Sequence, residues 1–316
     1  LLERFSIGHD RGSSHGRSRI FRFSYHDPRY VRMAQEALPL WRALEAEAGE
    51  AILQTTGGLD TGTALDDHLA ALEACGARFE VLDGVEVRRR FPALSLPDGT
   101  AALFQPDAGI VLADRAWRAF VAGAVAAGAA VREEAPALAI RPGDESVEVD
   151  AGGDRIHAGA AVVTAGAWAP GLLGPLGIDL PLRPTRETVA FFRLPEEARI
   201  PTVVDWGEAA VYALPSPGQG VKAGEHQAGP TADPDRNGGP DTVSVGRLGA
   251  WVAERYPGAD PEPHLVQTCL YTNAPGDEFV LERRGPVVVG SPCSGHGFKF
   301  APWVGERLAD LAEETL

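Results

Sequence analysis

The stretch GSPCSGHGFKFAPWVGE, residues 290–306, gathers side chains that could do chemistry. It places His296 between Gly295 and Gly297, and it places Lys299 just before a predicted helix. Glycine tolerates backbone conformations that other residues avoid, so such a loop can bring backbone N–H groups close to a ligand, with a fixed cation beside it. A tight turn between a strand and a helix would explain the glycines equally well.

A second loop of this type follows the apolar run AAVVTAG, residues 160–166. In a parallel α/β sheet, ligands bind at the carboxyl ends of the strands. Small residues at that place let backbone N–H groups and a helix N-terminus approach a phosphate or a ring carbonyl. Ordinary tight turns fit this pattern as well as a ligand site does.

The composition narrows the class of ligand. The chain has 316 residues and a formal net charge of −15, which argues against nucleic acid because that ligand needs clustered Lys and Arg. Three scattered cysteines give neither a disulfide framework nor a zinc spacing, so no metal site is predicted and a reduced, cytoplasmic setting is expected. The small-apolar run at residues 119–131 is too short to cross a membrane. We therefore expect a protein that acts on a small molecule.

Hydrophobic periodicity predicts helices over residues 30–49, 112–128 and 302–316, with Asp114 as the N-cap of the second. Apolar runs at 160–166 and 286–292, each followed by a loop and a helix, are typical of a parallel sheet covered by helices. Residues 183–280 are richer in proline and predict antiparallel strands. The expected fold class is thus α/β, a Rossmann-like parallel sheet with an interleaved antiparallel sheet.

The GxGxxG fingerprint of dinucleotide-binding folds does not occur at the start of the chain. The opening residues LLER could instead end the second strand of such a fold, with Glu3 as the acid that hydrogen-bonds a ribose. In that fold the acid follows the glycines by about twenty residues, so the glycine loop is expected upstream of Leu1.

Four ordered motifs carry a resemblance over nearly the whole chain. They are GSSHGRSRIFRFSY (12–25), VKAGEH (221–226), CLYT (269–272) and SGHGFKF (294–300). Together they resemble the monomeric sarcosine oxidase and N-methyltryptophan oxidase family of FAD-dependent amine oxidases. The resemblance implies a monomer with a discontinuous FAD-binding domain (1–50, 107–182 and 276–316) that lacks its N-terminal strand, loop and helix, and a substrate domain (51–106 and 183–275).

The resemblance assigns roles to four of these motif residues. Cys269 falls where some members attach FAD covalently, although a small buried cysteine would explain CLYT taken alone. Lys222 matches a lysine associated with oxygen activation, where a fixed cation stabilises developing negative charge. Arg22 and Lys299 match the pair that holds the substrate carboxylate, through a bidentate fork and a point charge.

The remaining assignments concern the substrate cavity and the flavin. Arg19 matches an arginine against the flavin ring, and His226, Tyr212 and Tyr271 match residues that line the substrate cavity. A lone histidine is more often structural than catalytic. The matching flavin contacts are Glu3, Ser13, Ser14, His15, Gly166, Gly295, His296 and Gly297. The chain departs from the family pattern at Gly276, where an aspartate is expected, and at Ser14, which replaces a common histidine.

The activity implied by the resemblance is oxidation of the C–N bond of a secondary amino acid. Sarcosine, another N-methyl amino acid or a cyclic imino acid would be the substrate, O2 the acceptor, and an imine or aldehyde and hydrogen peroxide the products. Two alternatives stay open. One is a dehydrogenase of the same fold that passes electrons to another protein, and the other is a non-catalytic remnant without the glycine-rich loop.

Overall fold

The structure, a computed structural model, describes residues 1–63, 65–195, 198–236 and 238–314. A small sheet contains the predicted parallel pair. Strand β10 (Ala161–Val163) runs parallel to β17 (Val287–Ser291), and β16 (Val280–Arg284) pairs with β17 in the antiparallel sense. Helix α7 (Ala301–Glu313) packs on this sheet, so the strand, loop and helix predicted at the C-terminal end are confirmed. Residues 315–316 of the predicted helix lie outside the described residues.

Helix α1 (Pro28–Ala48) confirms the first predicted helix and shows how local sequence sets its ends. The Asp27 carboxylate accepts from the Arg29 N–H at the N-cap, and Gly49 closes the helix in the left-handed conformation, with φ of 68°. Its buried face includes Trp41, whose Nε1 donates to the Lys299 carbonyl at 2.7 Å. Helix α1 thereby holds the backbone of the loop that precedes α7.

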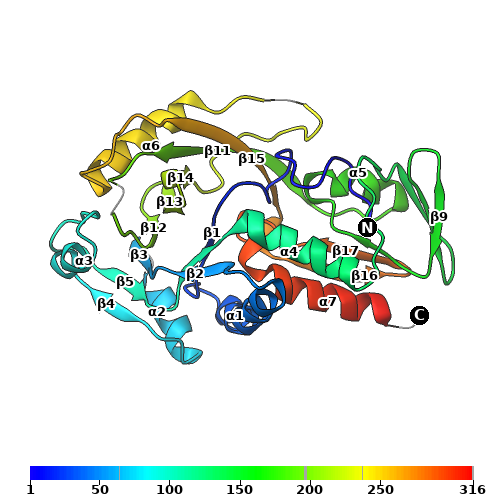
Figure 1. Cartoon of the computed structure of the whole chain (residues 1–316), viewed down its shortest axis with the longest axis horizontal. Coiled ribbons are helices and arrows are strands. Elements are labelled where there is room, and N and C mark those ends of the chain that lie inside the picture. Colours follow the sequence, from blue (N-terminus) through cyan, green and yellow to red (C-terminus); the bar gives the residue numbers. More distant parts are fainter. Residues whose placement is uncertain (64, 196–197, 237, 315–316) are drawn as a thin grey trace.

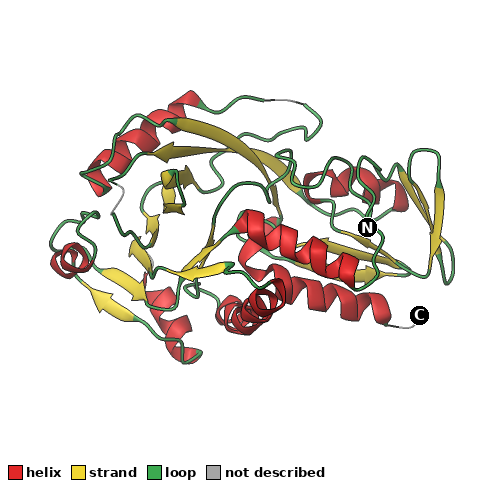
Figure 2. Cartoon of the chain, viewed as in Figure 1, coloured by secondary structure: helices red, strands yellow, loops and turns green. Residues whose placement is uncertain are grey.

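Helix α4 (Ala113–Ala126) confirms the second predicted helix but corrects its cap. The N-cap is Leu112, and Asp114 lies inside the first turn. There its carboxylate still faces the positive end of the helix dipole, which explains why the residue type suggested a helix start. Figure 2 shows α1, α4 and α7 gathered together, away from α6 (Thr242–Arg255).

An eight-stranded sheet occupies the other side of the molecule, in the order β15-β11-β14-β13-β12-β3-β5-β4. Strands β12 and β3 run parallel, and the other neighbouring pairs are antiparallel. Its strands are β3 (Gly58–Gly62), β4 (Glu80–Leu82), β5 (Ala102–Gln105), β11 (Arg183–Phe192), β12 (Thr202–Trp206), β13 (Ala210–Ser216), β14 (Gly220–Glu225) and β15 (Leu265–Asn273). The antiparallel strands predicted within 183–280 are therefore present.

Helix α6 covers the outer face of this sheet, along β11 and β14 (Figure 1). Side chains alternate across the sheet, so Val221, Ala223 and Glu225 of β14 face α6 while Lys222 and Gly224 face the opposite way. Glu225 accepts from Arg247 Nε at 2.6 Å and from Ser244 Oγ at 2.5 Å, both on α6. The face that α6 leaves free is the face that borders the site.

The remaining elements lie outside these two sheets. They are β1 (Arg19–Phe21), β2 (Leu53–Thr55) and β6 (Gly109–Val111) in one antiparallel sheet, β7 (Ala139–Pro142), β8 (Val147–Asp150) and β9 (Arg155–Ala158) in another, and helices α2 (Leu65–Ala74), α3 (Gly84–Arg90) and α5 (Ala169–Leu173). Short 3-10 turns occupy Gly166–Trp168, Gly174–Leu176, Pro275–Asp277 and Phe298–Phe300. Among the described residues, no helix combines the length and apolar character needed to cross a bilayer.

Candidate functional site

A cavity of about 520 Å³ lies between the large sheet and the loop that precedes α7. The predicted site residues that line it are Ser13, Ser14, Arg19, Arg22, Gly166, Tyr212, Lys222, His226, Cys269, Tyr271, Gly295, His296, Gly297 and Lys299. They come from loops and strands that are far apart in the sequence. Among the predicted site residues, Glu3 and His15 do not line this cavity.

Lys222 and His226 reach the cavity because they lie on the same face of β14 and its extension, with Gly224 between them. Tyr212 of β13 lies directly opposite Gly224. A Cβ on Gly224 would fall 2.6 Å from the Tyr212 hydroxyl, so glycine leaves the space that the tyrosine ring occupies. Burial, helped by the charge of Arg19, lowers the pKa of Lys222 to about 7.

Cys269 and Tyr271 lie two positions apart on β15, so they share one face of the strand, and both line the cavity. The Cys269 thiol is free and buried. Burial raises the pKa of this thiol, while the positive charges of Lys222 and Arg19 act in the opposite direction. Burial outweighs these charges, so Cys269 is a protonated thiol with the basic side chains of Lys222 and Arg19 close by.

Arg19 holds the shape of the loop that precedes it. Its guanidinium donates to the carbonyls of Ser13 at 2.5 Å, His15 at 2.6 Å and Ser18 at 2.8 Å. It also lies 5.6 Å from the centre of the Phe298 ring. These contacts fix residues 13–18 against the edge of the cavity.

Arg22 and Lys299 meet at Tyr25. The guanidinium of Arg22 lies 4.4 Å from the centre of the Tyr25 ring, and Lys299 Nζ donates to the Tyr25 hydroxyl at 2.9 Å. Arg22 is 9% exposed and Lys299 is 5% exposed, so both cations are removed from bulk water. Burial, together with the charge of Arg22, holds the pKa of Lys299 well below its ordinary value. An anion is the ligand that would stabilise such a pair.

The loop before α7 approaches its neighbours closely. Gly295 has φ of 77°, and a Cβ on Gly297 would fall 1.5 Å from the Pro292 carbonyl oxygen. His296 Nε2 lies 3.0 Å from the Asp277 carbonyl, and Lys299 Nζ donates to the His296 carbonyl at 2.7 Å. Gly295 therefore allows the left-handed backbone of this loop, and Gly297 allows its close packing on Pro292. The loop forms one wall of the cavity.

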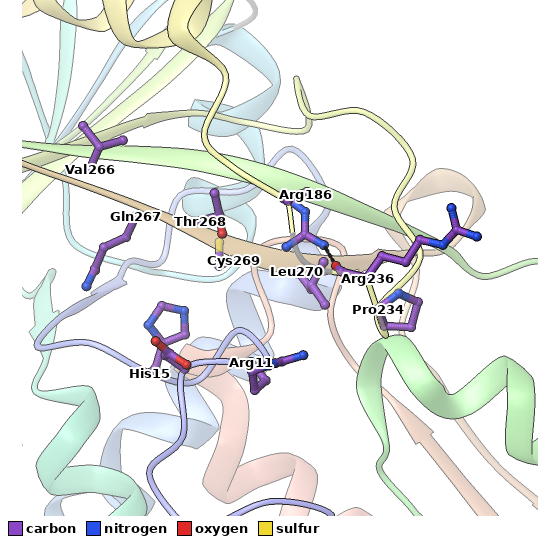
Figure 3. A pocket seen from close by; sticks show the side chains of 12 residues that line it. Arg11, His15, Arg186, Pro234, Arg236, Val266, Gln267, Thr268, Cys269 and Leu270 are labelled. Atoms are coloured by element: carbon purple, nitrogen blue, oxygen red, sulfur yellow. Dashed lines mark hydrogen bonds between the residues drawn. The ribbon is translucent and has the colours of Figure 1, made fainter.

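Glu3 and His15 lie elsewhere. The Glu3 carboxylate accepts from the Phe5 N–H at 2.9 Å, within its own loop. His15 lines a second pocket of about 430 Å³, which Cys269 also borders. Figure 3 shows His15 and Arg11 on one side of this pocket and Arg186 on the other. Burial lowers the pKa of His15 to about 4, so its imidazole is neutral at pH 7.

Several residues of the site were not predicted. Trp206 and Cys293 line the cavity, and Asp60 lies behind Arg22 at 3.2 Å. The signal for Asp60 was a carboxylate inside the otherwise apolar or small segment GGLDTG. A second signal is that the chain contains only two lysines, Lys222 and Lys299, and both are buried against this cavity.

The lining fits a flavin, the cofactor that the sequence resemblance implies. Ser18 Oγ and Ser291 Oγ are buried at the cavity and have no hydrogen-bond partner among the described residues. Helix α7 begins at Ala301, which lines the cavity, so the positive end of its dipole lies there. A ligand with a polar rim and a ring that can accept negative charge matches these groups.

Comparison with known proteins agrees with this geometry. The family model described as FAD dependent oxidoreductase matches residues 1–311. The peroxisomal sarcosine oxidase of Homo sapiens is 35% identical over 99% of this chain and 85% of that protein. The monomeric sarcosine oxidase of Bacillus sp. (strain B-0618) is 32% identical over 99% and 85%. The open form of NikD, an unusual amino acid oxidase essential for nikkomycin biosynthesis, superposes with a TM-score of 0.89 at 27% identity, over 99% of this chain and 87% of that structure.

Proposed function

The chain belongs to the family of FAD-dependent oxidoreductases, and on that basis we propose that it oxidises the C–N bond of a secondary amino acid. Sarcosine, another N-methyl amino acid or a cyclic imino acid is the substrate class. One observation carries this proposal: a single cavity holds a buried pair of cations, Arg22 and Lys299, and also the Cys269 thiol with Lys222 beside it. The first pair suits a carboxylate, and the second suits a redox cofactor.

In this proposal Arg22 and Lys299 bind the substrate carboxylate. Arginine supplies two parallel N–H donors and lysine a compact charge, so the two together fix both the position and the direction of the carboxylate. Tyr212, Tyr271 and His226 then border the rest of the substrate. Burial lowers the pKa of His226 to about 4, so its imidazole is neutral at pH 7 and does not repel a cationic amine.

Ser13, Ser14, Gly166, Gly295, His296 and Gly297 would hold FAD, with Arg19 against the ring and Cys269 as the covalent attachment. Bound there, FAD would take up the two electrons and the hydrogen that leave the C–N bond, and O2 would reoxidise it to give hydrogen peroxide. Glu3 stays a candidate for the ribose end of the cofactor, beyond this cavity. His15 supports the loop through its carbonyl, which accepts from Arg19.

In its protonated form Lys222 favours O2 over a protein acceptor, because a buried cation stabilises the negative charge that develops when O2 is reduced. We also propose that the residue ranges 1–50, 107–182 and 276–316 hold the cofactor and that 51–106 and 183–275 shape the substrate side. A monomer in a reducing, cytoplasmic setting is consistent with three free cysteines.

The covalent attachment is tested by acid precipitation. Flavin absorbance is compared in the pellet and the supernatant for the wild-type protein, Cys269→Ser and Cys293→Ser, the last being a matched control because Cys293 lines the same cavity. We expect flavin in the pellet for wild type and Cys293→Ser, and in the supernatant for Cys269→Ser. Flavin in the wild-type supernatant would remove the covalent assignment.

The activity is tested by hydrogen peroxide release with N-methyl and cyclic amino acids. Arg22→Gln is expected to raise KM by about 10- to 100-fold, because a hydrogen bond between two charged groups is lost. Electron transfer to an artificial dye without peroxide release would instead favour a dehydrogenase. A flavin-loaded protein that oxidises no amino acid would refute the proposed function.

A further inference from the structure

Asp60 is a buried carboxylate that the proposed reaction does not use. It lies on β3 and is 1% exposed. Its Oδ1 accepts from Arg22 Nη1 at 3.2 Å and from Trp206 Nε1 at 3.0 Å, and its Oδ2 accepts from Gln105 Nε2 at 2.7 Å. Two of these donors, Arg22 and Trp206, belong to side chains that line the cavity. Asp60 is therefore linked to the substrate side through them.

A chain of hydrogen bonds that begins at Gln105 holds Asp60 in position. Gln105 Oε1 accepts from the backbone N–H groups of Phe23 at 2.8 Å and Ser24 at 2.7 Å, and the Ser24 hydroxyl lies 2.8 Å from His68 Nδ1. Gln105 and Ser24 are fully buried. Both oxygens of Asp60 thus have donors with little room to move, and a buried charge held in this way keeps its position.

The charges can be counted around the part of the cavity lined by Arg22 and Lys299, which we call the carboxylate end. Arg22 and Lys299 bring two positive charges, and both are buried beside Tyr25. The described residues that line the cavity include no aspartate or glutamate, and Asp60 is the carboxylate paired with Arg22. The other two cavity cations, Lys222 and Arg19, are near Cys269. A bound carboxylate favours the protonated form of Lys299, so with a ligand present Arg22 and Lys299 bring two positive charges and Asp60 one negative charge, a net charge of one.

We propose that Asp60 restricts this site to ligands with a single negative charge, and that it orients Arg22 and Trp206 for them. The proposal rests on the proposed function, because it assumes that Arg22 and Lys299 hold the carboxylate. One carboxylate balances the net charge, whereas a second carboxylate in the same buried space would be repelled by Asp60 and would have no cation left to neutralise it. Asp60 is a positioning residue, since it acts through Arg22 and Trp206.

Two ligands of the same size test this selectivity. Succinate carries two negative charges, and succinamate replaces one carboxylate by an amide. Their dissociation constants are measured by calorimetry on the wild-type protein and on Asp60→Asn, which removes the charge and keeps the shape. We expect wild type to bind succinamate more tightly, and Asp60→Asn to shift the ratio of the two constants toward succinate by about tenfold or more, as one buried charge would at an effective dielectric constant of about 20.

Asp205→Asn is the matched control. Asp205 is also buried and also accepts from a tryptophan and an arginine, Trp251 Nε1 at 2.9 Å and Arg255 Nη2 at 3.2 Å, but it lies on the opposite face of the sheet. Its replacement should leave the ratio within about twofold of wild type. NMR of protein labelled with [13C]lysine supplies a second measurement, because the chain has only two lysines. The pKa of Lys299 should fall in Asp60→Asn and stay unchanged in Asp205→Asn.

The outcomes separate this proposal from the proposed function. An unchanged ligand ratio in folded Asp60→Asn would overturn the role of Asp60 even if the protein oxidises N-methyl amino acids. Tighter binding of succinate than of succinamate by wild type would overturn it without any variant. If neither ligand binds, the carboxylate end is wrongly assigned and the proposal fails, while peroxide release decides separately whether the oxidase activity stands.

Discussion

Replacing Lys222 by methionine should change how the stability of the protein depends on pH. Lys222 is 7% exposed, and its pKa is lowered from the usual 10.5 to about 7, first by burial and then by the charge of Arg19. The native state therefore releases this proton near neutral pH, whereas the unfolded chain keeps it until alkaline pH. Methionine has a similar length and no charge, so Lys222→Met removes this difference.

The sign and the size of the effect follow from proton linkage. Between about pH 7 and 10 the unfolded state binds more protons at this residue than the native state does, so the free energy of unfolding rises with pH. The two pKa values imply a rise on the order of 3 kcal/mol between about pH 6 and pH 9 that is due to Lys222 alone. At acid pH the wild type must bury a charged ammonium, so the variant should be the more stable protein there.

Urea unfolding of flavin-free protein from riboflavin-starved cells measures this effect. Both proteins are unfolded at about pH 6 and pH 9, and the difference between them cancels the contributions of other titrating groups. We expect Lys222→Met to be more stable than wild type by a larger margin at the lower pH. The [13C]lysine signal that disappears in Lys222→Met should titrate near neutral pH in wild type. Equal margins at both pH values, or a titration near the ordinary lysine pKa, would refute the reasoning.

Two further changes test the walls of the site and the outer face of the large sheet. Gly297→Ala should lower the free energy of unfolding by about 1–3 kcal/mol, because its Cβ would fall 1.5 Å from the Pro292 carbonyl oxygen. Gly246→Ala in α6 should be neutral or stabilising, because no atom lies in reach of its new Cβ. Equal effects of the two changes in urea unfolding would contradict this. Burial raises the pKa of Glu225, but hydrogen bonds from Arg247 and Ser244 outweigh burial and leave this pKa below its ordinary value. Glu225→Gln should therefore lower the free energy of unfolding by about 2 kcal/mol at neutral pH, and this loss should shrink as the pH falls through the native pKa of Glu225. A loss that stays constant down to strongly acid pH would show that the charge of Glu225 is irrelevant.

The elements that the sequence predicted well are those set by local signals. Helix α1 has an aspartate cap, a proline at its start and a terminal glycine, and the apolar runs of β10 and β17 each precede a small-residue loop. Most of the residues that the resemblance assigned to the site also line the cavity, since the fold brings the ordered motifs together. Glu3 and His15 are the exceptions, and both lie in irregular segments, where no periodicity fixes the direction of a side chain.

The network behind Arg22 could not be predicted in the same way. Asp60 meets Trp206 across 146 positions of sequence, and it does so because β3 inserts beside β12 in a parallel pairing that no local pattern encodes. In the sheet order, β3 begins a run of three strands from the first third of the chain, and β12 ends a run of five strands from the second half. The contact between these two runs sets the charge of the carboxylate end.

Lysine and arginine are used at different places in this protein. The chain has 29 Lys and Arg residues in total, of which only Lys222 and Lys299 are lysines, and both are buried at the cavity. Arginine stays charged in every environment, whereas a buried lysine can lose its proton near neutral pH. A net charge of −15 argued against a phosphate backbone as ligand, yet it said nothing about a cavity lined by two arginines and two lysines. Because a buried ligand responds to the charges within a few ångströms of it, the position of two lysines and one aspartate matters more to this site than the charge of the whole chain.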